Sequence, residues 1–322
     1  MRTGENPLVS IIIPTFNRAH LIGETLDSVV RQTYSNWECL VIDDGSVDRT
    51  EETVGRYTAR DARIRFYQRP SDFQPGGCGS RNFGLRKAEG KYIQWFDDDD
   101  LMLDNHLESC VFEAERKKLS ILIVRNKHFG ATEKIRGTSN VAYSNCLKTL
   151  TAQYISKQIV LGTPCLFLSR EVIGGALWNE KLKSKQDCDF IGRFLIESIG
   201  DSVEFSALDR ATVLIRKHAD SISNRNKCDS HLNEFFVRVN LYALFSSRHE
   251  MNYQERVILT KLLKKITTGI VSCGFFNFVK LALMLSKTAQ LKKLFPLFVL
   301  GTVWKLSLIA DFKNGKRKLI DG

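Results

Sequence analysis

Short apolar runs separated by helix-like segments fill the first hundred residues of the chain. The runs lie at residues 9–13, 38–42, 64–67 and 92–96. Each run is continuously apolar rather than alternating, which is typical of strands covered on both faces of a sheet. The segments between them predict helices over residues 20–33, 48–60 and 79–88. This βαβ pattern predicts an α/β protein with a mostly parallel sheet flanked by helices, in which ligands bind at the carboxyl ends of the strands.

The pattern loosens beyond residue 105. Residues 121–124 and 212–215 predict further strands, and residues 186–197 predict a helix with apolar side chains on one side. From about residue 229 the chain is helical in pattern, with helices predicted over residues 231–246, 253–271 and 275–291. We therefore divide the chain into an α/β domain, residues 1–225, and a mainly helical C-terminal region, residues 226–322.

The charge of the chain is concentrated at its C-terminal end. The net charge is +11, and residues 223–322 hold 17 Lys and Arg against 6 Asp and Glu, which accounts for all of it. Basic clusters alternate there with apolar stretches, a pattern that predicts attachment to an anionic membrane surface. The alternative is a helical cap packed on the first domain with its lysines in water. The sequence shows no combined aromatic and basic pattern of the kind that would predict nucleic-acid binding.

Cysteine spacing and the N-terminus indicate the compartment. The eight cysteines show no C-x-x-C pair, so we expect reduced thiols rather than disulfides or a zinc site. The apolar stretch near the N-terminus is about six residues long, too short for a signal peptide. No window reaches the ~18 apolar residues of a spanning helix. We expect a cytoplasmic protein, associated peripherally at most with the inner face of the membrane.

Special residues follow the first two predicted strands. Pro14 and Phe16 come after the first strand, and Asp43 and Asp44 after the second. Because neighbouring parallel strands end at one edge of the sheet, these side chains predict a pocket for a base and a ribose. A carboxylate there accepts from a base N–H or from ribose hydroxyls. The alternative is helix capping by Asp44 and its polar neighbours.

A glycine-rich segment, residues 76–84, follows the third predicted strand. It does not have the spacing or the position of a dinucleotide-binding fingerprint, so we reject that interpretation. Arg81 lies in this segment, in the expected first turn of a helix. Its guanidinium can support a phosphate or pair with a nearby carboxylate.

Four consecutive aspartates, Asp97 to Asp100, follow the fourth predicted strand. Carboxylates placed so close together repel one another unless a cation joins them. The run therefore predicts a cation site, and the alternative is a solvated acidic turn.

Taken in order, PTFNR, DDGSVD and GSRNFGLRKAEGKYIQWFDDDD resemble the N-terminal half of the family 2 glycosyltransferases. The resemblance covers roughly residues 7–222. It implies the GT-A fold, a Rossmann-like architecture, and an inverting transfer from a nucleotide-diphosphate sugar. It also makes residues 1–225 the catalytic domain.

The resemblance implies roles for individual residues. Asp44 matches the aspartate that contacts the base, and Pro14 and Phe16 line the nucleoside pocket. Asp97 and Asp98 lie by the ribose and diphosphate, and Asp99 is the metal ligand of a D-x-D element. The ion is Mn²⁺ or Mg²⁺, which suits oxygen ligands. The role of Asp100 stays open.

The resemblance also places the catalytic base. Asp187 matches it, in a stretch where Gln186 replaces the family's usual Glu, with Asp189 as the second candidate. His218, in a match to R-x-H-x-x-S, is implied to contact the metal or the diphosphate. Trp178 falls in a loop that borders the acceptor site, where it can stack on a sugar or pack in the core.

The function implied is a metal-dependent inverting glycosyltransferase, transferring a hexosyl or N-acetylhexosaminyl group. It would move the sugar from a nucleotide diphosphate, expected to be a UDP-sugar, to a hydroxyl of a glycan or lipid-linked acceptor of cell-surface polysaccharide. One alternative is a nucleotidyltransferase, which would need a G-x-G-x-R loop where PTFNR stands. Another is a non-catalytic glycan-binding or membrane-binding relative, which would have lost acids that this chain retains.

Overall fold

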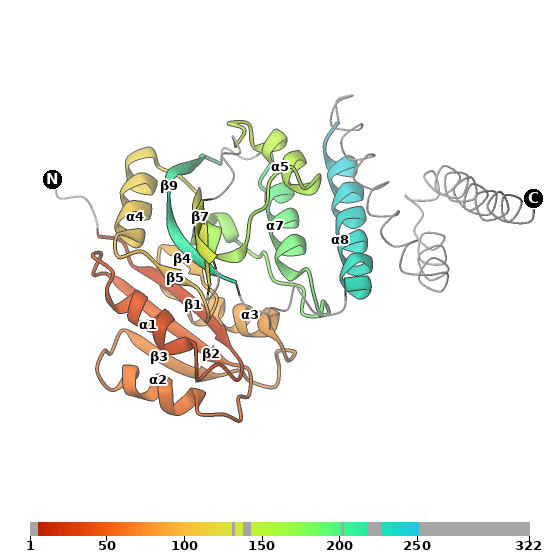
Figure 1. Cartoon of the computed structure of the whole chain (residues 1–322). Helices are drawn as coiled ribbons and strands as arrows, with labels where there is room; N and C mark the ends of the chain where they lie inside the picture. The colour runs from red at the N-terminus through yellow and green to blue at the C-terminus, as the bar shows by residue number, and fades with distance from the viewer. Residues whose placement is uncertain (1–5, 131–132, 138–142, 201–202, 218–226, 251–322) are drawn as a thin grey trace, which may run out of the picture. The chain divides into compact units, whose positions relative to one another are not determined.

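A computed structural model describes residues 6–130, 133–137, 143–200, 203–217 and 227–250 of the chain (Figure 1). All of these lie in the first of two units into which the chain divides, Met1–Leu262. Within the described residues, one mixed sheet forms the centre of this unit, with the order β3-β2-β1-β4-β8-β6-β9-β5 and with β7 paired to β6.

The first half of the sheet is parallel, as the apolar runs predict. It consists of β1 (Val9–Thr15), β2 (Trp37–Asp43), β3 (Ile64–Gln68) and β4 (Tyr92–Trp95). The connecting helices are α1 (Ile22–Val30), α2 (Thr50–Thr58) and α3 (Gly77–Lys87). Because these four strands run in one direction, the residues that follow β1, β2 and β4 meet at one edge of the sheet (Figure 1).

The second half of the sheet is mixed. Its strands are β5 (Leu101–Met102), β6 (Ile121–Gly130), β7 (Glu133–Gly137), β8 (Leu166–Ser169) and β9 (Phe205–Arg216). β8 is antiparallel to both β4 and β6, whereas β9 is parallel to β6. The two-residue β5 pairs with β9 directly after the acidic run, so the end of β9 lies beside that run.

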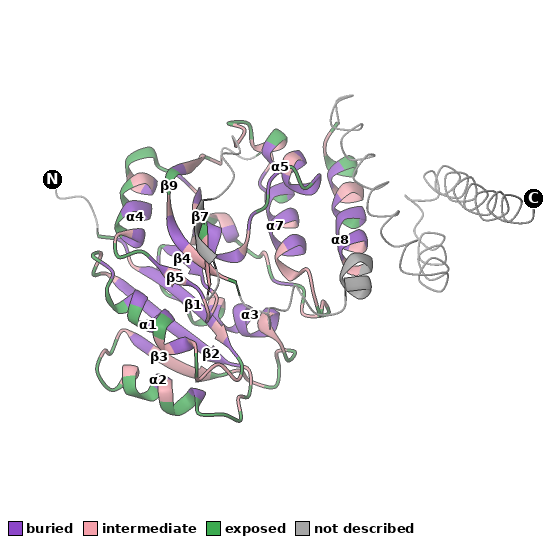
Figure 2. Cartoon of the chain, viewed as in Figure 1, coloured by how far each residue is buried: buried purple, intermediate pink, exposed green. Residues whose placement is uncertain are grey.

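Helices cover both faces of the sheet (Figure 2). The remaining ones are α4 (His106–Lys117), α5 (Leu147–Ile155), the 3-10 turn η1 (Thr163–Cys165), α6 (Arg170–Ile173), α7 (Gln186–Glu197) and α8 (Lys227–Arg248). Alternate residues of β1 face two separate cores, with Ile11 packed with α1 and α4, and Ile12 packed with α3, α5 and α7. This two-sided burial is why the strands lack alternation in the sequence.

The helix α8 packs against α7 inside the same unit. Gly192 of α7 allows this close approach, because a Cβ at that position would lie 2.3 Å from Cδ1 of Leu241 on α8. The division of the chain at residue 225 stays a prediction. The helix α8, which lies on the C-terminal side of that division, belongs to the unit that contains the sheet. The helices predicted over residues 253–271 and 275–291 lie outside the described residues. No helix in the described part of the chain is long and apolar enough to cross a membrane.

Candidate active site

The loops after β1 and β2 are joined by hydrogen bonds at the carboxyl edge of the sheet. The backbone N–H of Asn17 donates to Oγ of Ser46 at 2.8 Å, and Oδ1 of Asn17 accepts from the Val47 N–H at 2.9 Å. Asn17 adopts a left-handed conformation with φ 54, which Asn tolerates better than most residues. The neighbouring Phe16 ring is left 52% exposed. An aromatic face is thus presented beside the end of β2.

Asp44 pairs with Arg69, a residue for which the sequence motifs predict no role. Nε of Arg69, which follows β3, donates to the Asp44 carboxylate, and both side chains are largely buried. Nη1 of Arg69 also donates to the carbonyls of Pro70 and Phe73, which fixes the guanidinium. The signal for this pair, an arginine just past the neighbouring strand, is weak in the sequence.

The carboxylates on either side of Asp44 accept hydrogen bonds from backbone N–H groups. Asp43 accepts hydrogen bonds from the N–H groups of Gly45 and Ser46, at 3.2 and 3.0 Å. Asp48 accepts from the N–H of Thr50 at the start of α2, at 3.0 Å. Of these two, only Asp48 contacts a backbone N–H at the start of α2, whose N-cap residue is Arg49 without a side-chain cap hydrogen bond, and Asp44 is held by Arg69 rather than capping the helix.

The first two aspartates of the acidic run are fixed by residues from α1 and α3 and by the loop after β1. Nη2 of Arg81 donates to Oδ1 of Asp97 at 2.8 Å. The carbonyl of Asp98 accepts from Oγ1 of Thr25 at 3.0 Å, and its carboxylate lies 3.6 Å from Nε of Arg18.

The last two aspartates are fixed by one residue at the end of β9. Nε of Arg216 donates to the carbonyl of Asp99 at 2.9 Å, and the Arg216 backbone N–H donates to Oδ1 of Asp100 at 2.9 Å. Nη2 of Arg216 also bonds to Glu24 of α1 at 2.7 Å. The Asp100 carboxylate thus joins the acidic run to the end of β9. The side chain of Asp99 is half-buried and more accessible to solvent than the buried side chain of Asp100.

The acidic run lies in a region of excess negative charge. Burial, together with the charges of Asp187 and Asp99 and partly offset by Arg81, raises the pKa of Asp97 to about 6. Burial likewise raises the pKa of Asp98 to about 7. Burial and the neighbouring Asp97 and Asp99 raise the pKa of Asp100 well above its ordinary value. A cation placed among these oxygens would offset this repulsion.

No three His, Cys, Asp or Glu side chains in the described residues are arranged to hold a metal ion by themselves. This donor set still fits Mg²⁺ or Mn²⁺, because such ions commonly take one or two carboxylates and complete their coordination with substrate phosphates and water. His218, predicted as a further ligand, lies outside the described residues.

Arg81 links the acidic run to the start of α7. It is buried, its Cζ lies 4.7 Å from the ring centroid of Trp178, and its Nη1 would be 2.8 Å from a Cβ at Gly77. Although burial opposes its charge, Asp97 and Asp187 raise the pKa of the Arg81 guanidinium. α3 begins at Gly77, so Arg81 lies in its second turn, not its first. Of the two roles predicted for Arg81, the structure shows the carboxylate pairing.

Asp187 occupies the first turn of α7, where the helix dipole favours a negative charge. Its side chain is half-buried, and none of the residues that the structure describes hydrogen-bonds to its carboxylate. The second candidate for the base, Asp189, is paired instead with Arg193 of the next turn, at 2.8 Å. Of the two candidates, Asp187 is therefore the carboxylate without an ion-pair partner among the described residues, and its charge raises the pKa of both Arg81 and Asp97.

Trp178 belongs to the core. It is 2% exposed and stacks on Phe190 with ring centroids 4.2 Å apart and planes 6° apart. The alternative of core packing is therefore confirmed, and stacking on a sugar is excluded for this arrangement. The six described cysteines are all free.

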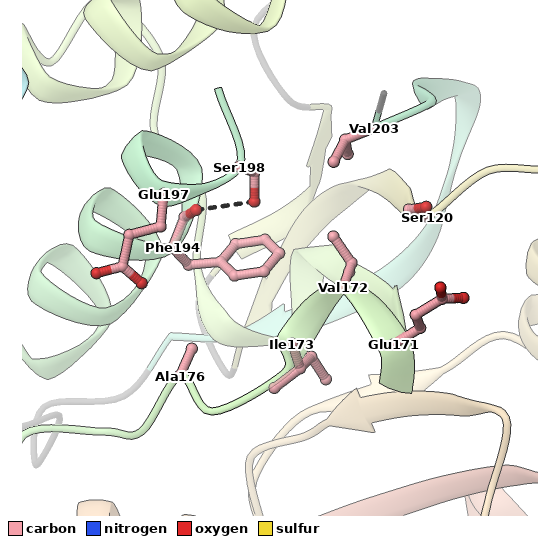
Figure 3. A pocket seen from close by; sticks show the side chains of 9 residues that line it. All are labelled: Ser120, Glu171, Val172, Ile173, Ala176, Phe194, Glu197, Ser198 and Val203. Atoms are coloured by element: carbon pink, nitrogen blue, oxygen red, sulfur yellow. Dashed lines mark hydrogen bonds between the residues drawn. The ribbon is translucent and has the colours of Figure 1, made fainter. Parts of the chain in front are cut away.

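A pocket of about 400 Å³ lies at the opposite edge of the sheet (Figure 3). It is lined by Ser120, Glu171, Val172, Ile173, Ala176, Phe194, Glu197, Ser198 and Val203. Its segments lie at the amino end of β4, because Ser169 of the antiparallel β8 is the partner of Tyr92. It is therefore separate from the edge that holds Asp44 and the acidic run.

Known proteins share this arrangement of strands and helices. The fold is similar to that of S. aureus TarS in complex with UDP, with TM-score 0.58 and 22% identity over 79% of this chain and 70% of that one. It is also similar to the mannosyltransferase PcManGT from Pyrobaculum calidifontis in complex with GDP-Man and Mn²⁺, with TM-score 0.53 and 15% identity over 91% and 84% of the two chains. The molecule thus has the GT-A fold of these two structures. The model of the family Glycosyl transferase family 2 matches residues 10–174, and the chain belongs to that family.

Curated relatives agree with this membership. The chain is 32% identical over 166 residues to the Escherichia coli UDP-Glc:alpha-D-GlcNAc-diphosphoundecaprenol beta-1,3-glucosyltransferase WfgD, covering 52% of this chain and 62% of that protein. It is 31% identical over 208 residues to the Escherichia coli putative colanic acid biosynthesis glycosyl transferase WcaA, covering 60% and 67%. The chain thus spans less than two thirds of the length of WfgD.

Proposed function

We propose that the protein is a metal-dependent inverting glycosyltransferase. It transfers a sugar from a nucleotide diphosphate, which we propose to be UDP, to a hydroxyl of a glycan or lipid-linked acceptor in cell-surface polysaccharide synthesis. The supporting observation is that Asp187 at the start of α7 lies near enough for its charge to raise the pKa of both Asp97 and the buried Arg81, which donates to Asp97.

The nucleoside would bind at the ends of β1 and β2. The exposed side chain of Phe16, directly after β1 and close to Pro14 of that strand, offers a surface for a planar base. The Asp44 carboxylate, oriented by Arg69, accepts the imide N–H of uracil. A base without such a donor would leave a largely buried carboxylate oxygen unpaired, which costs about 1–3 kcal/mol. This pairing favours a UDP-sugar.

The diphosphate would lie at the acidic run. Asp99 is the proposed ligand of Mn²⁺ or Mg²⁺, with His218 as a second one, and Asp97 and Asp98 face the ribose and diphosphate. The bound ion supplies stabilisation of the charge that develops on the departing diphosphate. Arg81 contributes by holding Asp97 in place.

Asp187 would act as the general base. The acceptor oxygen attacks the anomeric carbon as its proton moves to the Asp187 carboxylate, and the bond between that carbon and the β-phosphate oxygen breaks. The diphosphate leaves with the bonding electron pair, so the configuration at the anomeric carbon inverts. Gln186 in place of a second acid leaves Asp187 as the carboxylate available for this proton.

The acceptor proposal relies on relatives and charge. The name of WfgD specifies a diphosphoundecaprenol-linked acceptor, and that of WcaA specifies colanic acid biosynthesis. A lipid-linked acceptor here would match the basic C-terminal region, which we propose to lie on the anionic inner face of the membrane.

Calorimetry of UDP binding tests this function. UDP is expected to bind with Mn²⁺ present and to lose about tenfold or more in affinity with EDTA, because the phosphates would then face the carboxylates directly. Asp187→Asn should bind UDP normally but lose donor turnover. Metal-independent binding would contradict the diphosphate site, and retained turnover in Asp187→Asn would place the base elsewhere.

A further inference from the structure

We propose that α8, which lies beyond the segment matched by the family, positions the catalytic base. In this proposal, side chains of α8 fix the residues at the start of α7 and thereby the place of Asp187. It rests on the proposed role of Asp187 as the base.

The chain enters α7 through a conformation that needs support. Lys185, two residues before Asp187, has φ 59 and ψ 28, the left-handed region that non-glycine residues adopt at a cost. Two side chains of α8 contact this entry. Nδ2 of Asn233 donates to Oγ of Ser184 at 2.8 Å, and Oε2 of Glu234 lies 3.9 Å from Nζ of Lys185.

Glu234 also belongs to a buried ion-pair cluster. Its Oε1 lies 2.7 Å from Nζ of Lys157, which follows α5, and accepts from Nε of Arg238 at 3.1 Å. Glu234 is 5% exposed and Arg238 is 6% exposed. Charges buried to this extent persist only when they are paired and hydrogen-bonded, so the cluster has little freedom to shift.

Arg238 extends the contact to Asp187 itself through α5. Its Nη1 donates to the carbonyls of Tyr154 and Ile155, at 3.0 and 2.7 Å, and so satisfies carbonyls at the C-terminal end of α5. The hydroxyl of the buried Tyr154 donates to the backbone carbonyl of Asp187 at 3.2 Å. One α8 arginine thus fixes the residue that contacts the proposed base.

Close packing prevents α7 from sliding against α8. Leu241 lies directly over Gly192, where a Cβ would be 2.3 Å away. Cys188, the residue after Asp187, lies in the same apolar cluster as Leu241 and Phe245. Polar contacts at the entry of α7 and apolar contacts along it therefore set its position together.

This position matters because Asp187 must reach an acceptor hydroxyl. A misplacement of about 1 Å of a catalytic group costs up to about 100-fold in rate. The nucleoside site, in contrast, is formed by β1, β2 and Arg69, and within the described residues no hydrogen bond or ion pair joins it to α8. Loosening α8 should therefore reduce turnover and leave nucleotide affinity unchanged.

The test uses the full chain with Glu234→Gln and Tyr154→Phe. Hydrolysis of UDP-glucose, UDP-galactose and UDP-GlcNAc is measured with Mn²⁺, and UDP affinity by calorimetry. We expect kcat to fall about tenfold or more in Glu234→Gln and a few-fold in Tyr154→Phe, with UDP affinity within about twofold of wild type. Amide hydrogen exchange of residues 184–191 should rise in Glu234→Gln, a readout that needs no turnover.

Glu38→Gln is the matched control. Glu38 is also a buried carboxylate paired with an arginine, Arg65 at 2.8 Å, but it lies at the amino end of β2. The Glu38→Gln variant should have a lower melting temperature than wild type, with unchanged kcat and unchanged amide exchange of residues 184–191.

Three outcomes are decisive. Unchanged exchange at residues 184–191 in Glu234→Gln would overturn the role of α8. So would a loss of kcat that is accompanied by an equal loss of UDP affinity, because a general loss of folded protein explains it. Asp187→Asn in the same assay separates the two hypotheses: if it retains turnover, the proposed base is wrong, whereas if it is inactive and Glu234→Gln is fully active, only the role of α8 is wrong.

Discussion

Asp44 depends on a partner 25 residues further along the chain, Arg69. Arg69→Met would leave the Asp44 carboxylate without its donor and free to rotate. We expect UDP affinity to fall about tenfold, the loss of a charge-assisted hydrogen bond in the site, while the dependence on Mn²⁺ remains. Calorimetry measures both. Arg56→Met, which removes an exposed arginine paired with Glu52 on α2, is the control and should bind like wild type. Equal affinity in Arg69→Met would contradict the role of the pair.

His106 provides a prediction on pH. It is fully buried between Thr212 of β9, 2.8 Å from Nδ1, and Gln94 of β4, 3.3 Å from Nε2. Burial lowers its pKa to about 3. The unfolded chain takes up this proton near pH 6.5 and the native protein does not, so stability is lost as pH falls below 6.5. From pH 7 to pH 5 this histidine should remove about 2 kcal/mol from the free energy of unfolding.

Urea unfolding at the two pH values checks this. His106→Asn should be less stable than wild type at pH 7, yet lose about 2 kcal/mol less than wild type between pH 7 and pH 5. His20→Asn, at an exposed histidine, should follow wild type. Parallel losses in wild type and His106→Asn would show that His106 titrates alike in the folded and unfolded chain.

Some site residues could be predicted from the sequence because they directly follow strands or begin a helix. Asp44 and the acidic run Asp97 to Asp100 follow strands, and Asp187 lies at the start of a helix. The arginines that hold them, Arg69 and Arg216, could not be predicted, because each pairing depends on which strands become neighbours. Trp178 could not be decided either, since its burial depends in part on Trp95 of β4, which is distant in the sequence.

At the scale of elements, the parallel strands could be predicted and the mixed ones only in part. β1 and β2 are buried on both faces and read as continuous apolar runs. β9 begins seven residues before the predicted strand at 212–215, because its first half contains polar residues such as Asp209 and Arg210. β5 has two residues and is defined by its pairing with β9, which no local pattern specifies.

The contact between α7 and α8 gives a prediction at the same scale. Gly192→Ala should destabilise the protein by about 1–3 kcal/mol, because the new methyl group would overlap Leu241 and force the helices apart. Leu241→Ala would leave a cavity and cost about 2–5 kcal/mol. In the double variant the methyl group partly fills that cavity. The sum of the stability losses of the two single variants should therefore exceed the loss measured for the double variant. A double-mutant cycle in urea tests this. Additive losses would show that the two residues do not touch.

At the scale of the whole molecule, charge and chemistry are separated along the chain. Residues 1–222 hold 30 Lys and Arg against 30 Asp and Glu, a balance of zero, whereas residues 223–322 supply the net charge of +11. The proposed site for an anionic donor therefore lies in a neutral domain, and its phosphate-binding charge must come from individual residues and a metal. The basic region is left free for another anion, and a lipid surface is the one we propose.

The last prediction concerns this basic region, whose residues from 251 onward the structure does not describe. The protein should sediment with vesicles that contain anionic lipid and not with purely zwitterionic ones, because each lysine or arginine near the surface contributes about 1 kcal/mol. Deletion from residue 290, or replacement of Lys313, Lys316, Arg317 and Lys318 by Gln, should release it. Added salt should do the same, since screening shortens the reach of these charges. UDP affinity should stay unchanged in both variants, which separates loss of attachment from loss of folding. Unchanged partition after deletion would favour the alternative that the C-terminal region packs as a cap on the catalytic domain.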